Sequence, residues 1–242
     1  MALAAIAEHL PAERAGLSPT GAGSYQARRS WTGPPAEDTG SVTYEELFAE
    51  IDAHLSEGWF VILDTCLGSY PGADLNIQSV GRFMGCPVWL SIGHSVGAAV
   101  GVSFATEDPL LVICGDGGFQ MTAQAVSTLA KYNRSVLVLV INNGIYAIEQ
   151  YLIEPKYFKD PYYPELPFVR LNRWDYTSLA KGLGAKSTWR VAERAPLRQA
   201  LFEARENGGL GVLSVTVDPR DLPPENRVPL VSGARQPHPP AI

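Results

Sequence analysis

Two stretches of the sequence decide the fold: residues 110–118 read LLVICGDGG, and residues 136–144 read VLVLVINNG. Each is an apolar run of strand length that ends at glycine and polar residues. Between them, Ala123, Val126 and Leu129 recur at helical spacing and predict a helix. A strand, a tight turn, a helix and a second buried strand are typical of a parallel sheet, whose ligands bind beyond the carboxyl ends of the strands.

The rest of the chain continues this alternation of strand and helix signals. Strands are predicted over 59–63, 110–114, 136–141 and 212–217, and helices over 44–55, 95–105, 122–132, 176–183 and 196–206. Strands that alternate with helices indicate a parallel sheet built from strand-helix-strand units. We therefore expect an α/β domain, an open parallel sheet flanked by helices, over residues 41–218.

The two ends of the chain lack this alternation. Residues 1–40 combine an alanine-rich start with a stretch rich in Gly, Ser and Pro, which indicates an arm and a linker. Residues 219–242 are dense in proline and have no apolar periodicity, so we expect a tail that orders only on a partner. With 242 residues, 46% of them hydrophobic, the chain is expected to form one globular domain with extensions.

Composition argues against several classes of protein. The formal net charge of −6 disfavours a nucleic-acid partner, because phosphate backbones are bound mainly by clustered Lys and Arg. No apolar run approaches the roughly 20 residues of a membrane span, and Glu8 and His9 lie where a signal peptide is apolar. Cys66, Cys86 and Cys114 lack metal-ligand spacing, which favours reduced thiols. We expect a cytoplasmic protein with no membrane and no nucleic-acid partner.

Asp116 and Asn143 follow the two buried strands that are predicted over 110–114 and 136–141. They are 143 − 116 = 27 residues apart, which leaves room for one helix and a return strand. A carboxylate and an amide oxygen, with a backbone carbonyl and two diphosphate oxygens, can supply an octahedral Mg²⁺ shell. Gly-Asp-Gly and Asn-Asn-Gly are also ordinary turn sequences, and either one alone is weak evidence. Together, at this spacing, they favour a metal site.

Four segments carry a resemblance to a known family. Residues 114–124 read CGDGGFQMTAQ, residues 141–149 read INNGIYAIE, residues 91–99 read SIGHSVGAA and residues 172–176 read NRWDY. The first two look like the thiamine diphosphate signature, and specifically like pyruvate and indolepyruvate decarboxylases. The resemblance covers about residues 41–218, and it implies the diphosphate-binding domain of such an enzyme.

The resemblance implies thiamine diphosphate and Mg²⁺ as cofactors. Asp116 and the side chain of Asn143 would be metal ligands, with the main-chain carbonyl of Ile145 as a third. Gly117 and Gly118 would offer backbone N–H groups to the diphosphate, although the family commonly has Ser at the second of these positions. The implied cofactor contacts are Leu90, Ser91, Ile92, Gly115, Asp116, Gly117, Gly118, Asn143, Ile145 and Tyr146.

The resemblance also implies two residues that take part in catalysis. Ile92 would be the bulky apolar side chain that holds the cofactor bent, while the backbone carbonyl of Leu90 accepts from its amino group. Glu149 lies 149 − 143 = 6 residues after Asn143 and would handle the substrate carboxylate and proton transfers, as in decarboxylases of this family. The structural alternatives are an ordinary core isoleucine and a solvated helix glutamate.

The resemblance further implies a partner. Full-length relatives carry a separate pyrimidine-binding domain, whose Glu protonates the aminopyrimidine, and residues 1–40 leave no room for it. We therefore expect the catalytic subunit of a split enzyme that acts on a small 2-keto acid. It would form a hetero-oligomer with a partner that supplies this domain, and it would also associate with itself.

Two alternatives stay open at this point. The first is a β subunit of a 2-keto acid oxidoreductase, and the absence of closely spaced cysteines for an iron–sulfur cluster weighs against it. The second is a non-catalytic cofactor-binding or regulatory subunit, against which the presence of both Ile92 and Glu149 weighs.

Overall fold

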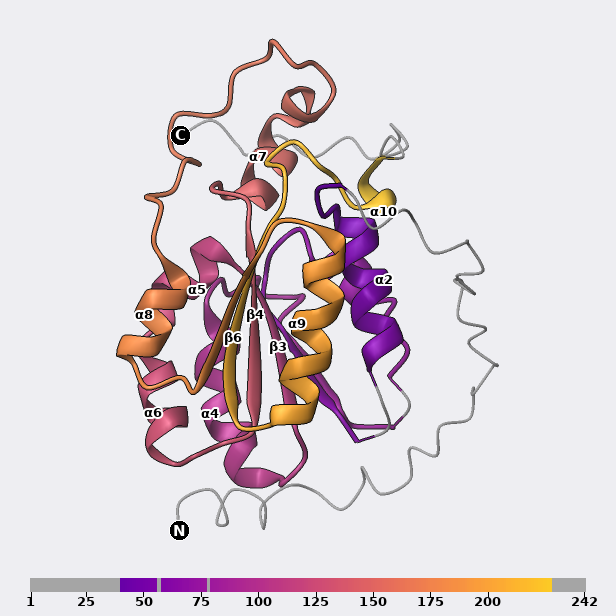
Figure 1. The fold of residues 1–242 in the computed structure, drawn as a ribbon. Coiled ribbons are helices and arrows are strands. Elements are labelled where there is room, and N and C mark those ends of the chain that lie inside the picture. Colours follow the sequence, from indigo (N-terminus) through magenta and orange to yellow (C-terminus); the bar gives the residue numbers. More distant parts are fainter. Residues whose placement is uncertain (1–39, 56–57, 78, 228–242) are drawn as a thin grey trace, which may run out of the picture. The chain divides into compact units, whose positions relative to one another are not determined.

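The computed structural model describes residues 40–55, 58–77 and 79–227. Their centre is a six-stranded sheet in which all neighbouring strands are parallel, in the order β2-β1-β3-β4-β6-β5 (Figure 1). The strands are β1 (Phe60–Leu63), β2 (Phe83–Gly85), β3 (Leu110–Gly115), β4 (Val136–Asn142), β5 (Ser187–Val191) and β6 (Leu210–Thr216).

Helices cover both faces of this sheet. On one face lie α2 (Tyr44–His54) and α9 (Arg194–Asn207), and on the other lie α4 (His94–Ala105), α5 (Asp116–Thr122), α6 (Ala125–Lys131) and α8 (Tyr176–Gly182) (Figure 1). Shorter helical segments are α3 (Ser69–Gly72), α7 (Ala147–Ile153), η2 (Pro155–Phe158) and α10 (Pro224–Arg227). The expected fold class, an open parallel sheet flanked by helices, is confirmed.

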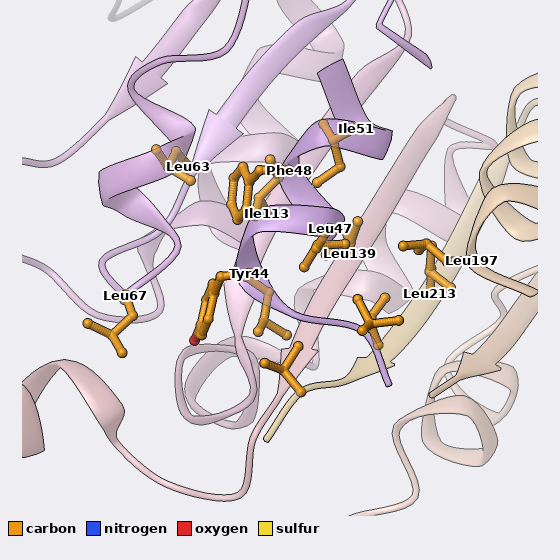
Figure 2. Close-up of a cluster of buried hydrophobic side chains, with 14 of the residues drawn as sticks. Tyr44, Leu47, Phe48, Ile51, Leu63, Leu67, Ile113, Leu139, Leu197 and Leu213 are labelled. Atoms are coloured by element: carbon orange, nitrogen blue, oxygen red, sulfur yellow. The ribbon is translucent and has the colours of Figure 1, made fainter. Parts of the chain in front are cut away.

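The central strands are buried on both faces, which explains their continuous apolar runs. Successive residues of β3 point to opposite sides: Ile113 packs in the cluster under α2 and α9, and Val112 packs in the cluster under α4. Figure 2 shows the first cluster, in which Leu47 of α2 lies near Leu139 of β4 and Phe48 of α2 lies near Ile113 of β3. Burial on two faces fixes the register, because a slip of one residue would send each side chain to the opposite layer.

Helix α2 begins where the sequence predicts. Thr43 caps it, since its hydroxyl accepts from the N–H of Glu46 at 3.3 Å while the Glu46 carboxylate accepts from the Thr43 N–H at 3.1 Å. The helix expected over 122–132 is instead divided into α5 and α6, and α5 starts earlier, at Asp116. The sequence analysis missed β2 and β5, because these outer strands are short and lack a buried apolar run.

The boundary expected at residue 218 is corrected by the structure. Residues 219–227 pack on the domain: Leu222 is buried, and the carboxylate of Asp221 accepts from the N–H of Tyr44 at 2.6 Å. The guanidinium of Arg220 lies 3.9 Å from the ring centroid of Tyr157. These contacts do not depend on apolar periodicity, so the proline-rich composition concealed them. The remainder of the expected tail, 228–242, and nearly all of the expected arm, 1–39, lie outside the described residues.

Within the described part of the chain, no helix combines the length and the apolar character that crossing a membrane requires.

Candidate cofactor site

A pocket lies at the carboxyl ends of β1, β3 and β4. Its wall is formed by the loops that follow these three strands, together with the first residue of α2 and one residue before α4. The residues are Tyr44, Thr65, Cys66, Leu67, Ile92, Gly115, Asp116, Gly117, Gly118, Asn143, Ile145, Tyr146, Ala147, Ile148 and Glu149. The chain leaves β1 toward one face of the sheet and leaves the neighbouring β3 toward the other face. Open α/β sheets bind ligands at the point where two neighbouring strands connect to opposite faces in this way.

Asp116 is the first residue of α5 and is only 2% exposed. One carboxylate oxygen accepts from the N–H of Gly117 at 3.0 Å, and the other accepts from the N–H of Gly144 at 2.7 Å. The second bond connects the start of α5, directly after β3, to the loop after β4. The convergence that the sequence predicts for these two strand ends is therefore present in the structure.

Asn143 occupies the second of these loops. Its amide oxygen accepts from the N–H of Ile145 at 3.1 Å, and its amide nitrogen donates to the hydroxyl of Tyr44 at 3.2 Å. Both the oxygen and the nitrogen of the Asn143 amide thus form hydrogen bonds, which fix the orientation of the side chain. Gly144, between Asn143 and Ile145, has a φ of +76°, a backbone conformation that a glycine adopts without strain.

The glycines after β3 leave space that side chains would fill. A Cβ on Gly117 would lie 2.3 Å from a ring carbon of Tyr146, and a Cβ on Gly118 would lie 3.1 Å from the Asp64 carboxylate. These positions lie in the first turn of α5, whose N–H groups have no backbone carbonyl partner within the helix, although that of Gly117 donates to the Asp116 carboxylate. Bare backbone at a helix start suits an anionic group.

The segment before α4 contributes unevenly to the pocket. Ile92 lines it as expected, whereas Leu90 and Ser91 are not among the residues of its wall. Leu90 is 48% exposed and has a φ of +51°, while the carbonyl of Ser91 lies 2.8 Å from the Nδ1 of His94. This contact ties His94, the first residue of α4, to the backbone before the helix.

Asp64 holds this segment in place, and sequence reasoning missed it. It follows β1 and is 1% exposed, and its two carboxylate oxygens accept from the N–H groups of Gly93 at 2.8 Å and Ser95 at 3.0 Å. Asp64 thereby fixes the position of Ile92 relative to the sheet. The available signal was an acidic residue directly after the buried strand, at the same edge as Asp116.

Glu149 lies in α7 and faces the same pocket. Its Oε2 is buried and has no hydrogen-bond partner among the described residues. Burial raises the pKa of Glu149 above its ordinary value. A half-buried carboxyl group with a free oxygen and a raised pKa is suited to proton transfer.

The residues present fit Mg²⁺ and a diphosphate. Asp116, Asn143 and Ile145 all line the pocket, and their carboxylate, amide and carbonyl oxygens are the ligand type that Mg²⁺ prefers. The described residues contain no group of three or more His, Cys, Asp or Glu side chains arranged for a metal. A protein-only cage is thus absent from this part of the chain, and the remaining ligands would come from the diphosphate and water.

We expect the stability of the metal-free chain to depend on Asp116 and on pH. Burial raises its pKa from 3.8 to about 7, although N–H donors from Gly144 and Gly117 oppose the shift. Between these pH values the carboxyl group of Asp116 is ionised in the unfolded chain but protonated in the folded chain. The free energy of unfolding therefore falls, by about 1–4 kcal/mol, as pH rises from about 4 to 7. Urea denaturation in EDTA across this range should show the fall in wild type but a smaller one in Asp116→Ala. Asp74→Ala, at an exposed position, is the control, and equal slopes in all three proteins would contradict the assignment.

Comparison with known proteins assigns the domain. The family model described as thiamine pyrophosphate enzyme, C-terminal TPP binding domain, matches residues 67–215. This range includes every expected site residue, from Leu90 to Glu149.

Individual relatives and a solved structure agree with the family match. An alpha-keto-acid decarboxylase of Mycobacterium tuberculosis is 29% identical over 182 residues, which are 74% of this chain and 31% of the relative. A probable pyruvate decarboxylase of Schizosaccharomyces pombe is 26% identical over 198 residues, which are 79% of this chain and 33% of the relative. The chain thus spans about a third of the length of these relatives.

The fold is also similar to that of benzoylformate decarboxylase from Polynucleobacter necessarius. The TM-score is 0.66 at 22% identity, over 79% of this chain and 36% of that one. This likeness supports the fold, while the family match covers the pocket residues from Leu67 to Glu149, including Asp116 and Asn143. The chain therefore belongs to the thiamine pyrophosphate enzymes and carries the C-terminal TPP-binding domain of that family.

Proposed function

We propose that this chain is the diphosphate-binding catalytic subunit of a thiamine diphosphate enzyme that decarboxylates, or joins by carboligation, a small 2-keto acid. The observation that carries the proposal is the meeting of Asp116, Asn143 and Glu149 in the wall of one pocket. When bound, thiamine diphosphate supplies the carbon that adds to the keto group of the substrate and takes up the electrons released with CO₂. The chain's own residues bind the cofactor, orient it and move protons.

Mg²⁺ would be held by Asp116, Asn143 and the carbonyl of Ile145. The domain needs such an ion, because a diphosphate is repelled by a chain with a net charge of −6. The metal also offsets the unfavourable burial of the Asp116 carboxylate, since a nearby cation favours its charged form. The N–H groups of Gly117 and Gly118 would complete the contacts to the diphosphate.

Glu149 would act on the substrate rather than on the cofactor's diphosphate. It lies six residues beyond Asn143 and one turn into α7 from Tyr146, on the wall that the loop after β4 forms. When protonated, its free Oε2 can donate a hydrogen bond to a substrate carboxylate. The same group can transfer the proton that completes the reaction. The relatives named above are decarboxylases, which favours this reaction over the oxidoreductase and regulatory alternatives.

A second polypeptide would complete the enzyme by supplying the pyrimidine-binding domain and its glutamate. One observation supports this part of the proposal. Large apolar side chains are exposed just before, within and after the edge strand β2, namely Val80, Phe83, Met84, Val88, Trp89 and Leu90. Exposed apolar side chains gathered in one segment are typical of interaction sites.

Cofactor binding is expected to depend on the two side-chain ligands. Asp116→Ala and Asn143→Ala should each abolish Mg²⁺-dependent binding of thiamine diphosphate, because the diphosphate then faces an acidic protein without its metal. Calorimetric titration in Mg²⁺ measures this effect. Asn142→Ala, which removes the neighbouring amide, serves as the matched control and should retain binding. Wild-type affinity in the Asp116 or Asn143 variant would disprove the metal assignment.

Turnover is expected to depend on Glu149 after the cofactor has bound. Glu149→Gln keeps the size of the side chain but removes the transferable proton, so kcat of the assembled enzyme should fall by roughly 10²-fold with cofactor affinity retained. Glu107→Gln is the control, since that side chain is 97% exposed. CO₂ release from pyruvate and phenylpyruvate measures kcat, and an unchanged value in Glu149→Gln would assign this residue to a surface role.

A further inference from the structure

Tyr44 lies in the cofactor pocket although it precedes every strand of the sheet. It is the first residue of α2, it is 1% exposed, and it lines the pocket together with Asp116, Gly117 and Asn143. In Figure 2 its ring extends from the first turn of α2, with the hydroxyl oxygen at the tip. The phenol therefore combines a ring packed in the hydrophobic core with a polar end in the pocket.

The direction of the hydrogen bond between Asn143 and Tyr44 follows from the other contact of the amide. The N–H of Ile145 donates to one end of the Asn143 amide at 3.1 Å. A backbone N–H can only donate, so that end must be the oxygen, and the end facing Tyr44 must be the nitrogen. The Tyr44 hydroxyl is therefore the acceptor of the 3.2 Å bond and keeps its own proton for a different partner.

That proton has no acceptor among the described residues. A tyrosine hydroxyl is protonated at neutral pH, so this group has a proton to donate. A buried donor without an acceptor destabilises the fold, whereas an anionic oxygen in the pocket would satisfy it. Gly117 and Gly118 beside it offer no side-chain donor of their own.

The hydroxyl is held at a fixed place before any ligand binds. The N–H of Tyr44 donates to the Asp221 carboxylate at 2.6 Å, and Thr43 caps the helix that begins at Tyr44. The segment that includes Asp221 packs on the domain through Leu222. A donor fixed in this way loses little conformational freedom when it meets its acceptor.

We propose that Tyr44 is a cofactor-binding residue whose hydroxyl accepts from Asn143 and donates to an oxygen of the bound diphosphate. This inference rests on the proposed function and extends it, because it couples the side chain of a metal ligand to the anion that the metal holds. Removal of the hydroxyl should therefore weaken binding of the diphosphate and leave the cofactor-free fold intact.

Tyr44→Phe tests the proposal against Tyr151→Phe, a matched change at a second buried tyrosine, whose hydroxyl bonds the carbonyl of Asn226 outside the pocket. Calorimetry with thiamine diphosphate and Mg²⁺ should show a Kd raised about 10-fold or more in Tyr44→Phe, because a hydrogen bond to a charged group is lost. Inorganic pyrophosphate with Mg²⁺ should show a similar loss. The urea midpoint of the cofactor-free Tyr44→Phe chain should equal or exceed that of wild type, and Tyr151→Phe should bind both ligands as wild type does.

Unchanged affinity in Tyr44→Phe, with wild type binding normally, would overturn this inference and leave the proposed function standing. An equal loss of affinity in both variants, with a lower urea midpoint in Tyr44→Phe, would show a purely structural role and would also overturn it. A wild-type chain that binds neither thiamine diphosphate nor pyrophosphate would instead overturn the proposed function, and this inference with it.

Discussion

The site depends on one hydrogen bond, from the N–H of Gly144 to the buried carboxylate of Asp116, 2.7 Å long. It joins the loops that follow the two central strands, and it exists only because β3 and β4 are adjacent, parallel and in register up to the pair Gly115 and Ile141. A shift of one residue would separate the two loops and move their side chains to the opposite layers. The apolar cores on both faces of the sheet thereby determine the geometry of a polar site at its edge.

The pocket carries buried polar groups whose hydrogen-bonding capacity is only partly used within the described residues. Burial raises the pKa of Asp116 to about 7, and Glu149 has an oxygen without a partner among the described residues. The hydroxyl of Tyr44 likewise keeps an unused proton. Such groups cost stability in the empty domain, and each would gain a partner from a metal, a diphosphate or a substrate. Their concentration in one pocket indicates selection for binding rather than for folding.

Sequence reasoning succeeded where the signal was local. The apolar runs of β3 and β4 and the polar residues that end them predicted the sheet and the meeting of Asp116 with the loop of Asn143. It missed Asp64, which acts by hydrogen bonds to backbone 29 and 31 residues away, and Tyr44, whose partner Asn143 is 99 residues away. Contacts between distant residues leave no periodic pattern in the chain.

The same limit applies to residues 219–227. These residues pack on the domain through a few polar contacts rather than through a repeating apolar face. Composition alone therefore assigned them to the tail instead of to the domain. Asp221 bonds the start of α2, and Arg220 donates to the carbonyl of Tyr163 at 2.9 Å. This segment therefore contacts the cofactor pocket through Tyr44.

The central proposal is that this chain supplies the diphosphate half of an active site whose pyrimidine half lies on another polypeptide. The residues proposed for the site would contact the diphosphate, the metal and the substrate, and none of them is assigned to the aminopyrimidine ring. The most direct measurement is CO₂ release by the purified chain with Mg²⁺ and thiamine diphosphate, using pyruvate, phenylpyruvate and indolepyruvate. The account predicts no release above the rate without protein. Full decarboxylase activity of the chain alone would contradict it, because a carboxylate within this sequence would then perform the function assigned to a partner.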